Sequence, residues 1–175
     1  SLRNSGTAYY LLSLYQEALN DLVEAQQLFQ KLDEPGANAS VIRTIGNIFH
    51  SLNQNQKAID EYNKAIEITR KIDDRQGTAY NLGNIGYVLQ KLGRYDESRA
   101  SIFQALEIME GMSDELGLSD AYNNLGSIYL IEGDFAEALK YFNEAFEKSS
   151  SVTHLRGMAG AKINMGDYHH RQNEH

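Results

Sequence analysis

Residues 122–145 read YNNLGSIYLIEGDFAEALKYFNEA, and this stretch decides the fold. Its first half places apolar residues on one face of a helix: Leu125, Ile128 and Tyr129. Its second half does the same: Ala138, Phe142 and Ala145. Gly133, between the halves, suits the left-handed residue that ends a helix. The stretch therefore predicts two helices joined by a tight turn.

The same unit recurs along the chain with a period of 40 residues. Glycine occupies one position of every unit: Gly6, Gly46, Gly86, Gly126 and Gly166. Small residues follow twelve positions later: Ala18, Ala58, Ser98 and Ala138. Alanine stands seven positions further on: Ala25, Ala65, Ala105 and Ala145. Small residues recur where two helices approach closely, so the period predicts an array of helix pairs.

The period sets the expected layout of one array over residues 1–175. We expect about nine helices, paired as 1–13 with 16–33, 38–52 with 55–72, 76–92 with 95–112, and 117–132 with 135–150, followed by a lone helix at 155–172. The repeats then cover about 1–37, 38–76, 77–116 and 117–154, with a half repeat at 155–175. The half repeat and the absence of an initiator Met indicate a piece of a longer parent chain.

The last helix is expected to expose an apolar surface. Four of its residues should pack on helix 135–150 from one side: Leu155, Met158, Ile163 and Met165. Their other side has no second helix of a pair to cover it. We therefore expect end-to-end self-association through this helix.

Composition excludes several classes of protein. The net charge of −8 argues against a general nucleic-acid binder, which is normally basic. No run of about 18 apolar residues is present, so no membrane span is expected. The chain has no cysteine, which excludes disulfides and thiolate chemistry and fits a cytoplasmic protein.

The pattern resembles the tetratricopeptide repeat. The fourth unit supplies the family's aromatic and small residues: Tyr122, Leu125, Gly126, Tyr129, Ala138, Phe142 and Ala145. The third unit matches more loosely: Leu82, Ile85, Gly86, Leu89, Ser98, Ile102 and Ala105. The family's usual proline near the end of the repeat is missing, and the period is 40 rather than roughly 34. These departures are similar to the long-repeat branch, as in Pins/LGN-type and kinesin-light-chain-type proteins.

The resemblance implies an all-α, right-handed superhelical solenoid of antiparallel helix pairs. In that family the first helix of each pair lines a concave groove that binds a protein or peptide. One groove column reads Asn4, Thr44, Asn84, Asn124 and Asn164. Asparagine is a poor helix former, and its carboxamide can both donate to and accept from a peptide backbone. Two interpretations fit this column: it binds a peptide main chain, or it fixes the stacking of neighbouring repeats.

Other groove positions predict charge and an apolar anchor. Arg3, Arg43, Asn47 and Asn84 resemble half of the clamp that chaperone-binding repeats use for a carboxylate, whereas Asn123 and Ser127 replace the remaining cations. We expect a ligand with an acidic or C-terminal carboxylate group near Arg3 and Arg43, unless both pair with nearby Glu. His50 also falls on the groove. Tyr87, Leu130 and Ile131 would seat an apolar side chain or pack on the next repeat.

No pattern in the sequence indicates catalysis. His169 and His170 are adjacent, so on a helix they point about 100° apart and cannot share a metal ion. No metal, cofactor or enzymatic activity is expected. We expect a protein-interaction scaffold with these peptide-binding residues: Arg3, Asn4, Arg43, Asn47, His50, Asn84, Tyr87, Asn123, Asn124, Ser127 and Asn164. The alternative is a ligand- or peptide-sensing regulatory domain from a larger bacterial signalling protein.

Overall fold

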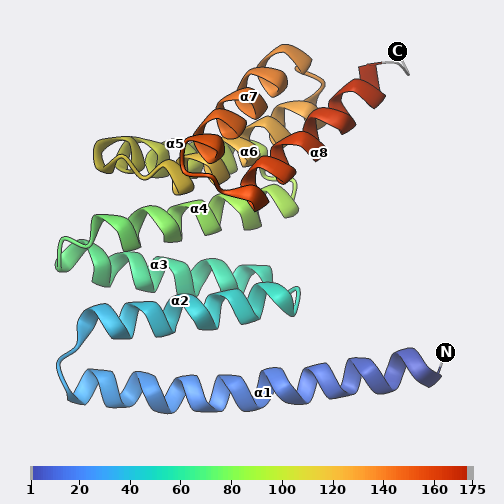
Figure 1. The fold of residues 1–175 in the computed structure, drawn as a ribbon. Coiled ribbons are helices and arrows are strands. Elements are labelled where there is room, and N and C mark those ends of the chain that lie inside the picture. The colour runs from blue at the N-terminus through green and yellow to red at the C-terminus, as the bar shows by residue number, and fades with distance from the viewer. Residues whose placement is uncertain (1, 173–175) are drawn as a thin grey trace. The chain divides into compact units, whose positions relative to one another are not determined.

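A computed structural model describes the backbone of residues 2–172 and the side chains of residues 14–170. Eight helices follow one another and no strand occurs in this part (Figure 1). They are α1 (Leu2–Lys31), α2 (Pro35–Ser51), α3 (Asn55–Lys71), α4 (Arg75–Lys91), α5 (Tyr95–Met112), α6 (Glu115–Glu132), α7 (Phe135–Ser151) and α8 (Leu155–Gln172). The prediction of an all-α fold is confirmed.

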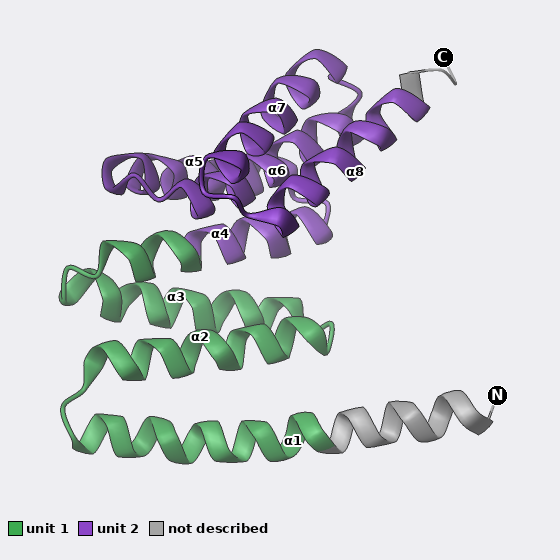
Figure 2. Cartoon of the chain, in the orientation of Figure 1, with its two compact units in different colours: residues 1–81 green, residues 82–175 purple. Residues whose placement is uncertain are grey.

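The helices form two compact units, residues 1–81 and 82–175, which divide within α4 (Figure 2). In unit 1, α2 packs against both α1 and α3. In unit 2, α6 packs against α5, α7 and α8, and α7 also packs against α8.

The first expected helix pair is a single helix, so the predicted break between 1–13 and 16–33 is wrong. Elsewhere the turn inside a pair contains a residue with positive φ: Asn53 (58°), Gly93 (73°) and Gly133 (83°). Ser13 stands at this position in the first unit, and Leu14 follows it. Neither residue favours the left-handed conformation as Gly or Asn does, and Leu14 cannot cap a new helix. The helix therefore continues, which gives eight helices instead of about nine.

Three glycines of the column, Gly46, Gly86 and Gly126, lie where the two helices of a pair approach each other. In unit 1, a β-carbon added to Gly46 would lie 2.6 Å from the ring of Tyr62, which is buried. In unit 2, one added to Gly86 would lie 2.5 Å from Ile102, and one added to Gly126 would lie 2.5 Å from Phe142. Larger residues would push these helices apart.

In α8 only part of the predicted face is buried: the packing of Met165 is confirmed, and Met158 is half-buried. Ala161 and Tyr168 are buried, and Met165 packs on the cluster formed by Leu130, Ala138, Phe142 and Tyr168. Leu155 is 73% exposed and Ile163 is 66% exposed, so the prediction that they pack on α7 is wrong. Ile163 lies two residues beyond Ala161, about 200° around the helix, and so points away from the buried face.

Candidate functional site

A cleft in unit 2 brings together several of the predicted site residues. It encloses about 350 Å³, and we call it the amide cleft. Its walls come from three helices: Tyr87, Gln90 and Lys91 on α4, Asn123, Asn124, Ser127, Leu130 and Ile131 on α6, and Asn164 and Asp167 on α8. Seven of these were expected on the groove from sequence: Tyr87, Asn123, Asn124, Ser127, Leu130, Ile131 and Asn164.

Two carboxamides of the amide cleft, on different helices, are hydrogen-bonded to each other. The Asn164 Nδ2 donates to Asn123 Oδ1 at 3.3 Å, which joins α8 to α6. Ser127 Oγ donates to the Asn123 carbonyl one turn earlier on α6, at 2.9 Å. This geometry supports a stacking role for Asn164, one of the two interpretations of the asparagine column.

Asn124 differs from its neighbours in the amide cleft. It is half-buried, and none of the hydrogen bonds among the described side chains involves its carboxamide. Both its donor and its acceptor therefore remain available to a ligand in the cleft.

The apolar part of the amide cleft is Tyr87 and Ile131, which are 38% and 46% exposed. Leu130 is buried in the core beside Phe142, so packing is its main role. The Lys91 ammonium lies 5.0 Å from the centre of the Tyr87 ring, which places a cation beside the exposed aromatic face.

The remaining candidates do not line this cleft. Asn84 is half-buried on α4. In unit 1, the Arg43 guanidinium carbon lies 6.0 Å from the centre of the Tyr80 ring. Asn47 Oδ1 accepts from the Tyr62 hydroxyl at 2.7 Å, and His50 Nδ1 lies 2.8 Å from Asn55 Oδ1. The side chains of Arg3 and Asn4 lie outside the described residues, so an acidic ligand near Arg3 and Arg43 stays a prediction.

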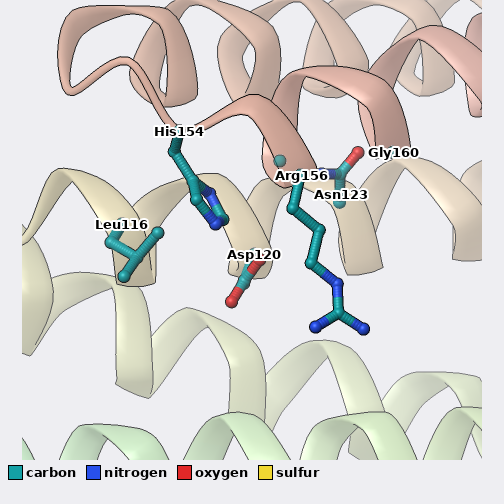
Figure 3. A pocket seen from close by; sticks show the side chains of 7 residues that line it. Leu116, Asp120, Asn123, His154, Arg156 and Gly160 are labelled. Atoms are coloured by element: carbon teal, nitrogen blue, oxygen red, sulfur yellow. The ribbon is translucent and has the colours of Figure 1, made fainter.

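A second cleft in unit 2 lies between the first turns of α6 and α8, and we call it the charged cleft (Figure 3). It encloses about 450 Å³ and is lined by Leu116, Asp120, Asn123, His154, Arg156, Gly157 and Gly160. Desolvation by the surrounding protein raises the pKa of the Asp120 carboxyl, and the charges of His154 and Arg156 act in the opposite direction. Asn123 lines both clefts.

The charged cleft was not predicted from the sequence, although a signal was present. Its repeat position reads Ser40, Tyr80, Asp120 and Gly160. Asp120 and Gly160 occupy this position in consecutive repeats. The change from a carboxylate to a glycine indicates that the packing at this position differs between the two repeats. The second signal is His154, which stands where two earlier repeats have Asp74 and Asp114.

Two kinds of arrangement do not occur in the described part of the chain. No three His, Cys, Asp or Glu side chains gather there as a metal site would require. None of its helices combines the length and the apolar character that crossing a membrane requires.

Several solved structures have a similar fold. Aspartyl phosphate phosphatase F from Bacillus subtilis is 18% identical with a TM-score of 0.79, over 95% of this chain and 43% of that one. The apo form of RapI is 19% identical with a TM-score of 0.81, over 91% and 58%. BtubC (BKLC) from P. vanneervenii is 18% identical with a TM-score of 0.66, over 95% and 70%. This chain thus spans 43% of the phosphatase chain and 58% of the RapI chain.

The family assignment comes from the sequence itself. No curated protein is found to match it. A family model described as the tetratricopeptide repeat matches residues 1–71 and 75–149, which is most of the chain. With the helix pairs and the close glycine contacts described above, this protein belongs to the tetratricopeptide repeat family.

Proposed function

We propose that this chain is a protein-interaction module that binds an extended peptide segment of a partner in the amide cleft. The observation that carries the proposal is the convergence of carboxamides from neighbouring helices on one cleft, next to an exposed apolar strip. The proposal concerns binding alone, and no catalytic step is assigned to the chain.

Carboxamides suit the main chain of a peptide. Asn124 offers a donor and an acceptor without an internal partner to displace. Asn123 and Asn164 also line the cleft, and their mutual hydrogen bond uses only one donor and one acceptor of the two carboxamides. A carboxamide can hydrogen-bond both the N–H and the C=O of a peptide backbone. It can therefore bind an extended peptide regardless of the side chains of that peptide. Specificity then has to come from the other residues of the cleft.

The other residues favour a peptide with an apolar side chain next to charged groups. Tyr87 and Ile131 offer exposed apolar surface, which loses contact with water when a side chain covers it. Lys91 and Asp167 add one charge of each sign. These two residues favour peptides that place an opposite charge beside each of them, and they disfavour peptides that place a like charge there.

The alternative is a sensing domain of a larger signalling protein, in which the same cleft would bind a peptide signal. The fold shared with an aspartyl phosphate phosphatase and with RapI supports this idea only at the level of fold, because the identities are 18% and 19%. The two functions differ in the source of the peptide and not in the cleft.

A peptide array probed with the purified chain tests the proposal, followed by titration of the best peptides against variants. Asn124→Ala should weaken binding about tenfold, since it removes a donor and an acceptor that both contact the ligand. Asn143→Ala is the matched control, because Asn143 is an exposed asparagine inside α7 and does not line the amide cleft. If the Asn124→Ala variant and the wild type bind the peptides with equal affinity, the proposal is refuted.

A further inference from the structure

Arg156 is set apart from the other cations of unit 2. Within residues 82–170, every other Lys and Arg lies in an ion pair or over an aromatic ring: Lys91, Arg94, Arg99, Lys140, Lys148 and Lys162. No such contact holds the Arg156 guanidinium, although it acts on Asp120 through space. An open guanidinium in an acidic protein is available for an external acceptor.

Asp120 is the second open charge of the charged cleft. It forms no ion pair with Arg156 or His154, although both influence its carboxyl. Figure 3 shows the carboxyl between the side chains of His154 and Arg156, with the guanidinium extended away from α8. The cleft therefore holds one negative and one positive group that do not neutralise each other by contact.

His154 adds a polar edge to the charged cleft. In α6, Asp114 caps the first turn by accepting from the Gly117 amide at 3.0 Å. His154 takes this place before α8, and its Nδ1 is buried without a hydrogen-bond partner. Because Nδ1 is buried, Nε2 is the nitrogen left to serve a ligand.

Gly160 opens the wall of the charged cleft. A β-carbon added there would meet only Asn123 Nδ2, at 3.9 Å. The other repeats carry Ser40, Tyr80 and Asp120 at this column. The missing side chain leaves space beside Asn123, so the Asn123 carboxamide can be reached from the α8 side.

These charges select the chemistry of the ligand. A simple anion would be attracted by Arg156 but repelled by Asp120, and a simple cation would meet the reverse. A group that offers ammonium donors to Asp120 and an oxygen acceptor to Arg156 satisfies both residues. An α-ammonium next to a carboxylate or carbonyl oxygen is such a group, because it offers donors on one side and an acceptor on the other.

We infer that the charged cleft binds an α-ammonium group together with its adjacent oxygen. Asp120 accepts hydrogen bonds from the ammonium, and Arg156 donates to the oxygen. The ligand is either a free amino acid or the N-terminal residue of a peptide, since both carry this chemistry. The peptide source rests on the proposed function, because Asn123 lines both clefts, whereas the amino-acid source does not.

The probes for the test are the proteinogenic L-amino acids, their amides and their N-acetyl derivatives, titrated into the purified chain by NMR or calorimetry. Amino-acid amides keep the ammonium and the carbonyl, as a peptide N-terminus does. N-acetyl derivatives lose the ammonium. We expect binding of at least one amino acid or its amide, and a loss of about tenfold or more on N-acetylation and in Asp120→Asn and Arg156→Gln.

Gly160→Leu is the decisive variant. Leucine is a better helix former than glycine, so the variant should fold at least as well while its side chain fills the charged cleft. Gly83→Leu is the matched control, since Gly83 lies inside α4 with no atom within 4 Å of an added β-carbon. Binding should be lost in Gly160→Leu and kept in Gly83→Leu.

Each result decides the inference. Absence of binding by all probes overturns it, and so does equal binding of the N-acetyl derivatives, which would reveal a simple anion site. If peptides bind in an Asn124-dependent way and N-acetylation does not change their affinity, the peptide source is overturned while the proposed function stands. The inference as a whole is then overturned if the free amino acids also fail to bind. Amino acids that bind when no peptide does support the charged cleft and count against the proposed function.

Discussion

The Asn164 carboxamide donates a hydrogen bond to Asn123 Oδ1 at 3.3 Å, so a side chain of α8 is tied to α6 inside the amide cleft. The two interpretations of the asparagine column meet in this contact. A ligand would compete with the bond if the pair serves binding, and the bond would secure the packing of α8 if it serves stacking.

Asn164→Ala separates the two roles. Loss of the hydrogen bond lowers the unfolding free energy by about 1 kcal/mol. The higher helix propensity of Ala compared with Asn raises it by about 0.5 kcal/mol. We therefore expect the unfolding free energy to change by less than about 1 kcal/mol in urea titrations, while the affinity for peptides from the array falls several-fold. A large loss of stability with unchanged affinity would assign Asn164 to stacking alone.

Gly126→Ala should destabilise the protein although alanine favours helices. The added β-carbon would lie 2.5 Å from the Phe142 ring and 3.1 Å from the Ala138 carbonyl oxygen, and both lie in the core. Overpacking of this kind costs about 1–3 kcal/mol.

Gly83→Ala is the control for Gly126→Ala. Nothing lies within 4 Å of the added β-carbon at Gly83, so this variant should gain up to about 1 kcal/mol. If close approach explains the glycine column, urea unfolding should show a lower unfolding free energy for Gly126→Ala and a higher one for Gly83→Ala. If the unfolding free energy changes in the same direction in both variants, that explanation is refuted.

Much of the fold could be predicted because its constraints are local and periodic. From α2 to α8 the predicted helix bounds lie within three residues of the observed ones, since left-handed turn residues recur at fixed positions such as Gly93 and Gly133. The prediction was wrong where the turn chemistry is missing, at Ser13 and Leu14. At Gly46, Gly86 and Gly126 the glycine column was read correctly as close packing, whereas Gly166 has no atom within 4 Å of an added β-carbon.

The site was only partly predictable because contacts across repeats are not periodic. Asn124 and Asn164 of the asparagine column line one cleft, but the sequence could not show that Asn164 bonds Asn123 while Asn124 has no such bond. Their role in binding stays a prediction. Asp120 and Arg156 lie 36 positions apart, which is outside the 40-residue register. Only the packing of α8 on α6 brings them to one cleft.

Self-association through α8 gives a further prediction. Leu155 and Ile163 expose most of their surface, and exposed apolar side chains favour contact with a second molecule. Light scattering of the wild type should show a mass that rises with concentration. The double variant Leu155→Ser, Ile163→Ser should reduce this rise, whereas Val152→Ser, which changes an exposed apolar residue just before α8, should not. A wild type that stays monomeric at high concentration would contradict the prediction.

Asp120→Asn should raise stability at neutral pH while it weakens binding in the charged cleft. Desolvation raises the pKa of Asp120 in the folded protein, so the folded state holds the charged carboxylate less well than the unfolded chain does. Asp120 is exposed to solvent, which screens its charge, so the resulting penalty on the unfolding free energy is small. It is fully present above the folded pKa and disappears below the unfolded pKa of about 3.9. The variant's advantage in thermal melts should therefore be largest at pH 7 and vanish as the pH falls below about 3.9. A residue that costs stability and is needed for a ligand is typical of a binding site. If the variant is instead less stable at pH 7, the Asp120 carboxylate is held by favourable contacts to His154 and Arg156, and it serves the fold instead of a ligand.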